Sequence, residues 1–190
     1  VFSPSSNSNG LASASIAFKV KDDGGTTNGG LDLDPQPKII TVNLIAVNDA
    51  PFGSSKTITT LQNNTYTFIA SDFGFVDGSD TSANNLLAIK ITSLPTNGFL
   101  SNNGAFVNVG DLISRGDIDK GILVWTPVFS GFGKSYSVFS FQVRDDGGTA
   151  NGGVDLDPIA RTMTIDVDQV AWVSDNPGAG LSVYSDTNNI

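Results

Sequence analysis

One stretch of this sequence occurs twice. Residues 18–35, FKVKDDGGTTNGGLDLDP, recur at residues 141–158 as FQVRDDGGTANGGVDLDP, so the offset is 141 − 18 = 123 residues. The offset holds without a gap when residues 1–47 are aligned with residues 124–170, and by direct count 19 of these 47 positions are identical. A repeat of this kind indicates units of one size that share one fold.

The repeat divides the chain into three parts. Residues 1–47 correspond to the last third of one repeat, and residues 48–170 form one complete repeat of 123 residues. Beyond Val170 the two copies diverge, so residues 171–190 are either a tail or the start of a following module.

Short runs in the complete repeat alternate between apolar and polar residues, as antiparallel strands with one wet face do. In one run we expect Leu87, Ile89 and Ile91 to point inward. The pattern predicts strands at 54–60, 64–71, 86–93, 98–108 (a hairpin), 120–126, 136–144 and 160–168. Strands in this order predict an all-β, immunoglobulin-like antiparallel β-sandwich, with residues 1–47 as part of a second repeat.

Composition excludes several classes of function. All 19 acidic residues are aspartates, and the net charge of −9 argues against nucleic-acid binding. The chain has no His and no Cys, which removes imidazole bases, Ser-His-Asp and Cys-His systems and the usual zinc ligands. Paired carboxylates can hydrolyse glycosides, but catalytic sites are rarely duplicated within a repeat. No apolar run approaches the roughly 18 residues that span a membrane. We therefore expect neither an enzyme nor membrane insertion.

Aspartates collect in three of the expected loops. In an immunoglobulin-like sandwich, the start of the first strand and the loops after the second and sixth strands emerge at one pole. Eight aspartates fall at these places: Asp49, Asp72, Asp77, Asp80, Asp145, Asp146, Asp155 and Asp157. The first copy carries counterparts of the last four: Asp22, Asp23, Asp32 and Asp34.

These twelve aspartates are candidate calcium ligands. We expect no base to pair with them, so they would repel one another unless a cation neutralised them, and Ca²⁺ accepts roughly six to eight oxygen ligands. Aspartate next to glycine also forms turns without any ligand. The matching length and content of the two loops favour calcium over turns alone.

Two groups of motifs resemble a known family. The string DDGGTxNGGxDxDP, followed by a strand and then by VNDAP at residues 47–51, resembles the cadherin-like tandem repeats of giant bacterial surface proteins. LPTNGFL at residues 94–100 and LVWTP at residues 123–127 are similar to the chondroitin-sulfate-proteoglycan-type variant of that repeat. The resemblance covers residues 1–47 and 48–170.

The resemblance implies a cadherin-like sandwich in a tandem array, secreted or at the cell surface, with a structural or adhesive role. It implies other copies or neighbouring repeats as partners, together with a cell-surface or matrix ligand. Asp77 and Asp145 lie near the positions where that family places calcium ligands. Cadherins also use Glu from the preceding module, which this sequence lacks, so a site within one pole is expected. Arg115-Gly116-Asp117, an integrin-type tripeptide, falls in an expected loop.

Two roles remain open. The chain is either a spacer or adhesin repeat, or a self-assembling filament subunit in which residues 1–47 and 171–190 are completed by neighbouring chains. The second role rests on one apolar face that we expect on residues 1–47. Its members are Ile16, Phe18, Val20, Ile40, Val42 and Leu44.

Overall fold

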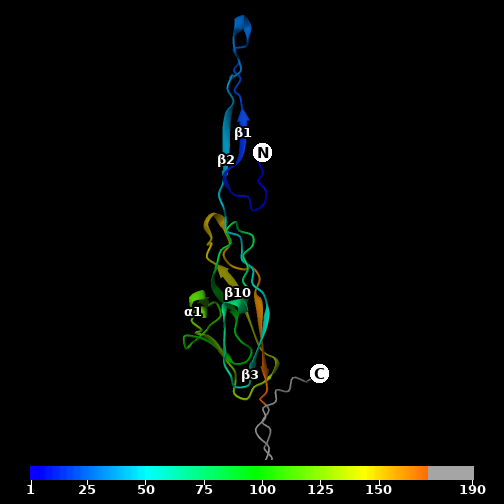
Figure 1. Ribbon diagram of the computed structural model, residues 1–190, viewed down its shortest axis with the longest axis vertical. Helices are drawn as coiled ribbons and strands as arrows, with labels where there is room; N and C mark the ends of the chain where they lie inside the picture. Colours follow the sequence, from blue (N-terminus) through cyan, green and yellow to red (C-terminus); the bar gives the residue numbers. More distant parts are fainter. Residues whose placement is uncertain (171–190) are drawn as a thin grey trace, which may run out of the picture. The chain divides into compact units, whose positions relative to one another are not determined.

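The computed structural model describes residues 1–170 (Figure 1). The chain divides into two compact units, Val1–Val47 and a second unit that begins at Asn48, and this boundary coincides with the boundary between the repeats. The expectation for residues 171–190 lies outside the described residues.

The first unit is a long hairpin. β1 (Gly10–Phe18) pairs antiparallel with β2 (Lys38–Leu44), with a bulge near the start of β1. The loop between them contains a 3-10 turn, η1 (Thr27–Gly29), where Asn28 adopts the left-handed conformation with φ of 58°. Asparagine tolerates this conformation better than most residues. Within residues 1–47 these two strands form a sheet of their own, and most of their side chains are exposed.

The second unit contains two sheets. The strand order is β3-β11-β10-β5-β8 in one sheet and β4-β9-β6-β7 in the other, and β3 runs parallel to β11 while the other pairs are antiparallel. The strands are β3 (Lys56–Leu61), β4 (Tyr66–Thr67), β5 (Leu86–Ser93), β6 (Phe99–Asn102), β7 (Ala105–Phe106), β8 (Leu112–Ser114), β9 (Leu123–Thr126), β10 (Gly133–Asp145) and β11 (Arg161–Asp168). The helical turns are η2 (Ala70–Phe73), α1 (Arg115–Asp119) and η3 (Ala150–Gly152).

Both sheets of the second unit contribute to one core. Phe68, which follows β4, packs edge-to-face on Phe139 of β10 at 5.6 Å between ring centroids. Phe73 of η2 packs in the same way on Phe141 at 5.0 Å. Each of these rings is fully buried, and burial of one such side chain stabilises the fold by about 1.5–3 kcal/mol. The all-β class is confirmed for the described residues.

Most expected strands form, and the exceptions have local causes. The run at 86–93 is β5 itself, but Leu87 is 45% exposed while its neighbours Leu86 and Ala88 are buried. Asp145 pairs with Leu86 and Arg144 with Ala88, so Leu87 lies in a bulge. The bulge leaves the Leu87 side chain exposed, although alternation predicts that it points inward.

The expected strand at 64–71 is reduced to Tyr66–Thr67. The Asp72 carboxylate accepts a hydrogen bond from the Ile69 amide at 3.0 Å and closes the 3-10 turn η2 in its place. The short strand β8 and the helix α1 were not expected from the alternation.

The two hairpins repeat one another in detail. Gly10 lies opposite Leu44 in the first hairpin and Gly133 lies opposite Val167 in the second, and each number differs by 123. Both hairpins carry a bulge directly after this pair, and both loops contain a 3-10 turn at equivalent residues. The sequence repeat is therefore also a repeat of backbone geometry.

Candidate metal site

Four of the expected calcium ligands lie in one hydrogen-bonded group, which we call the acidic pole. It consists of the carboxylates of Asp77, Asp80 and Asp145, the side-chain amides of Asn48 and Asn84, and Asp49, whose backbone amide donates to Asp80 and whose charge acts on that carboxylate. Residues 48 and 49 precede β3, residues 77–84 lie between η2 and β5, and Asp145 ends β10. The topology of the two sheets brings these three segments together.

Neutral amides supply the partners of two of these carboxylates. Asp145, which is fully buried, accepts hydrogen bonds from Asn48 Nδ2 at 3.1 Å and from the Gly147 amide at 2.9 Å. Asp80 accepts from the Asp49 amide at 3.1 Å and from Asn84 Nδ2 at 3.4 Å. Neither carboxylate has an ion-pair partner among the described residues.

Asp77 is the least satisfied member of the acidic pole. Its side chain is 8% exposed, and its Oδ2 accepts a hydrogen bond from the Asn84 amide at 2.5 Å. Its Oδ1 is buried and has no hydrogen-bond partner in the described part of the chain. A buried polar group left without a partner costs about 1–3 kcal/mol, and more when it is charged.

The negatively charged carboxylates of the acidic pole repel one another. Burial is the main cause that raises the pKa of Asp145, and the negative charge of Asp77 adds to it. Burial also raises the pKa of Asp80, again with a contribution from Asp77 and a further one from Asp49. Both shifts show that negative charge at this pole is not fully compensated by the protein.

Three other expected ligands are neutralised by bases, against the expectation that none would pair with them. Their ion pairs are Asp72 with Lys56 at 2.6 Å, Asp155 with Arg144 at 2.7 Å and Asp157 with Arg161 at 2.8 Å. The sequence does not reveal these pairs, because the partners come together only when the chain has folded. These carboxylates form ion pairs within the fold, so their charge is already neutralised without a metal ion.

Asp157 shows this structural role most clearly. It is fully buried and accepts hydrogen bonds from the Gly53 amide at 2.8 Å and the Ile159 amide at 2.9 Å as well as from Arg161. Burial alone would raise the pKa of Asp157, but these donors outweigh it and lower the pKa. The Asn85 amide donates to Asp146 at 2.7 Å and lowers the pKa of that carboxyl.

The first unit repeats the local contacts of the second. Lys21 pairs with Asp32 at 3.1 Å and Lys38 with Asp34 at 3.4 Å, at positions equivalent to two of the ion pairs above. Asp22 accepts a hydrogen bond from the Gly24 amide at 2.9 Å, as its counterpart Asp145 does from Gly147, and Asp23 is exposed. The first unit contains no segment equivalent to residues 76–85, so the described part of it holds only the hairpin side of such a pole.

The acidic pole fits calcium in part. Nowhere in residues 1–170 do three ionisable ligands already stand at metal-binding positions around one point. The unpartnered Oδ1 of Asp77 and the nearby carboxylates of Asp80 and Asp145 are hard oxygen donors of the kind that Ca²⁺ takes. The amides of Asn48 and Asn84 turn nitrogen toward these carboxylates, and a flip of either amide presents its oxygen instead.

The Arg-Gly-Asp tripeptide is not in a loop. It begins α1, where Arg115 pairs with Asp119 at 2.7 Å and the amide of Asp117 donates to the capping hydroxyl of Ser114 at 3.0 Å. The Asp117 carboxylate accepts a hydrogen bond from Asn102 at 3.2 Å. Both charged side chains of the tripeptide are engaged within the chain.

No described helix is long and apolar enough to cross a membrane. The function is inferred from the residues and the geometry of this chain, because comparison with protein-family models, with curated proteins and with solved structures finds no match.

Proposed function

We propose that this chain is a structural and adhesive repeat module of an extracellular tandem array, with a cadherin-like sandwich whose acidic pole is stabilised by calcium. The motifs that resemble cadherin-like repeats cover both units. The strand order supports the same assignment, because β11, β10 and β5 lie side by side, as the last, the last but one and the third strand do in one sheet of an immunoglobulin-like sandwich. An array of this type is a secreted or cell-surface structure.

The observation that carries the proposal is the duplicated hairpin. Two segments 123 residues apart keep the same register, the same bulge and the same pair of ion pairs. Selection that preserves a whole supersecondary unit at a fixed period is typical of proteins that extend by repetition. A catalytic role does not explain it, and we propose that the chain is not an enzyme.

Calcium is proposed to act as a clamp between three segments. A cation at Asp77, Asp80 and Asp145 would link the loop before β5 to the end of β10, and the amide of Asn48 ties the segment before β3 to the same place. Neutralising the buried Asp77 Oδ1 removes the cost that this oxygen imposes on the cation-free fold. The pole then becomes stiffer as well as more stable.

Isothermal titration of the intact chain with CaCl₂ tests this proposal. We expect saturable binding that is lost in the Asp77→Asn variant and retained in Asp22→Asn, which removes the counterpart of Asp145 from the first hairpin. Equal heats for wild type and Asp77→Asn would place any bound calcium elsewhere and contradict the clamp.

The runner-up role, a self-assembling filament subunit, stays a prediction. It is favoured by the exposed apolar face of the first hairpin, where Phe18 is 38% exposed although its counterpart Phe141 is fully buried. Sedimentation velocity of the intact chain over a wide concentration range decides between the roles. Growth into long assemblies supports the filament, and a concentration-independent monomer supports the spacer or adhesin repeat.

A further inference from the structure

In the second unit, an extended segment is seated on the second hairpin. This segment, the leader, is Asn48–Gly53 with the sequence Asn-Asp-Ala-Pro-Phe-Gly. Asn48 Nδ2 donates to the Val154 carbonyl at 2.8 Å, and the Val154 amide donates back to the Asn48 carbonyl at 2.9 Å. The Gly53 amide donates to Asp157 Oδ2 at 2.8 Å. The leader then continues into β3, which pairs parallel with β11.

The first hairpin presents the same acceptor groups. Asp22, Leu31 and Asp34 are the counterparts of the three residues that bind the leader at Asp145, Val154 and Asp157, and the loop that holds them has matching backbone hydrogen bonds. In the first unit these groups border an open hollow of about 300 Å³. Its walls are Val20, Asp22, Leu31, Asp32, Leu33, Asp34 and Pro35.

Gly24, two residues after Asp22, is open to an occupant where its counterpart in the second hairpin is covered. At its counterpart Gly147, a Cβ atom would collide with the side chains of Asn48 and Asn84, so glycine is required by the seated leader and its neighbour. At Gly24 only the carboxylate of Asp22 comes near, with the closest atom at 3.2 Å, and the backbone has no positive φ. Within the first hairpin one side-chain contact restrains a Cβ here, and a small shift of Asp22 relieves it, whereas an occupant like the leader would exclude the Cβ.

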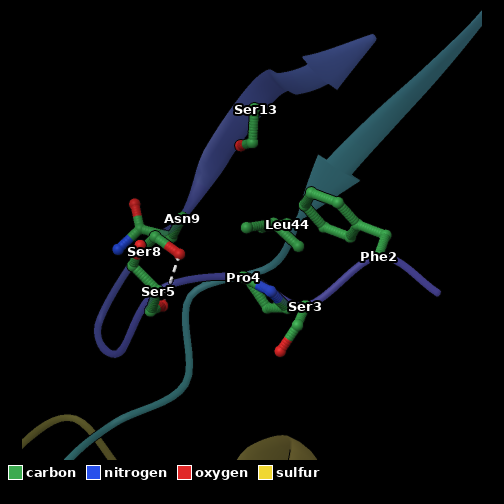
Figure 2. A pocket seen from close by; sticks show the side chains of 8 residues that line it. All are labelled: Phe2, Ser3, Pro4, Ser5, Ser8, Asn9, Ser13 and Leu44. Carbon is green, nitrogen blue, oxygen red and sulfur yellow. Dashed lines mark hydrogen bonds between the residues drawn. The ribbon is translucent and has the colours of Figure 1, made fainter. Parts of the chain in front are cut away.

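The apolar face of the sheet in the first hairpin is also uncovered. Its apolar side chains are exposed, while the equivalent side chains of the second hairpin are covered by the strands of residues 48–126. The exposed members include Ile16, Phe18, Val20 and Ile40. Phe2 and Leu44 line a second open hollow of about 330 Å³ at the end of β2, and their side chains lie next to each other in Figure 2. Phe2 corresponds to Trp125, which is fully buried and donates to the Asn97 carbonyl at 3.1 Å.

We propose that the first hairpin is an acceptor for an extended segment that has the chemistry of residues 48–61 and lies outside residues 1–170. The inference rests on the proposed role as a repeat module but not on calcium. The segment's Asn would bind Asp22 and Leu31, its Gly amide would bind Asp34, and its strand would extend the sheet alongside β2 in parallel.

An identical copy of this chain is a poor source for the segment. Residues 1–170 contain two acceptor hairpins but one such segment, which is already seated on β11. If one copy placed its segment on the first hairpin of another copy, its own second hairpin would lose the same contacts. The exchange would therefore give no net gain of contacts. A segment of this chemistry that is not already bound to a hairpin gains all of these contacts without that loss.

Binding of a synthetic peptide with the sequence of residues 48–61 to the intact chain tests the proposal, with fluorescence anisotropy of a labelled peptide as the readout. We expect saturable binding to wild type that weakens at least about tenfold for the Gly24→Ala chain, because the new methyl group fills the seat. A peptide with Asn48→Ala and Gly53→Pro should weaken to a similar extent, since it loses the side-chain amide and the donated N–H.

Two controls show whether the peptide binds at the seat itself. The melting temperature of Gly24→Ala should equal that of wild type, which shows that the variant changes the seat and leaves the fold intact. Equal peptide affinity for wild type and Gly24→Ala, or no binding to wild type, overturns the proposal. Strong association of the intact chain with itself, blocked by Gly24→Ala, shows that an identical copy supplies the segment and overturns the choice of a separate segment. Calcium titration run in parallel reports on the proposed function separately, because the acidic pole lies in the second unit.

Discussion

Replacing Asp77 by asparagine should have opposite effects with and without calcium. The substitution keeps the shape of the side chain, and its remaining oxygen can still accept the hydrogen bond from the Asn84 amide. The buried Oδ1 that has no partner becomes an NH₂ group. The charge of Asp77 raises the pKa values of Asp80 and Asp145, so the substitution also removes this repulsion, and the new NH₂ group can donate a hydrogen bond to a carboxylate.

The magnitude follows from the lost repulsion and the gained hydrogen bond. Satisfying one buried polar group is worth about 1 kcal/mol or somewhat more. For a domain of this size, about 1 kcal/mol corresponds to roughly 3–5 °C in melting temperature. In excess chelator, Asp77→Asn should therefore melt about 3–5 °C above wild type. In excess calcium the order should reverse, because the variant has lost a charged ligand.

Differential scanning calorimetry of both proteins in both buffers measures the four melting temperatures, and Asp22→Asn serves as the matched control that should follow wild type in each. A variant that melts below wild type in chelator refutes the account of Asp77 as an uncompensated charge. A variant that still gains stability from calcium as wild type does refutes its role as a ligand.

Three further predictions concern other parts of the structure. Arg161→Met leaves the buried Asp157 without its cation and should lower the free energy of unfolding, measured in urea, by about 3–5 kcal/mol. Lys38→Met at the exposed counterpart should lower it by at most about 1 kcal/mol, and equal losses would contradict the burial argument. Gly147→Ala should lower the melting temperature by several degrees because a Cβ collides with the side chains packed there, and an unchanged melt would show that the loop shifts freely. In chelator, the raised pKa of Asp145 should contribute stability as pH falls toward the ordinary aspartate pKa of about 3.9, because the folded state takes up a proton before the unfolded state does. The pH dependence of wild type should therefore differ from that of Asp77→Asn by a larger gain at low pH, and an equal or smaller gain in wild type would contradict the sign.

The repeat and the alternation of apolar residues were enough to predict the all-β class and most of the strands. The unit boundary expected after Val47 and the equivalence of the two hairpins follow from the 123-residue offset, whereas the register within each hairpin is seen only in the structure. Local departures could not be predicted, because they depend on contacts between distant residues. The bulge that exposes Leu87 reflects how β5 pairs with β10, and the turn that replaces the second half of an expected strand depends on the side chain of Asp72.

The candidate site was predictable only as a location. Aspartates in three loops of one pole are visible in the sequence, but which of them meet a base is not. Arg144 and Arg161 lie 11 and 4 residues from their partners Asp155 and Asp157 and reach them only when the hairpin has formed. Asn84 gives no signal by composition, although it donates to the acidic pole through both its side-chain amide and its backbone.

The melting temperature of the intact chain in excess calcium and in excess chelator tests the central claim most directly. A cation present at about 100 times its dissociation constant stabilises the folded state by about 2.7 kcal/mol, which corresponds to a rise of several degrees. We expect this rise in the transition of the second unit, with the gain growing as the logarithm of the calcium concentration. An identical melting curve in calcium and in chelator would contradict a calcium-stabilised repeat module.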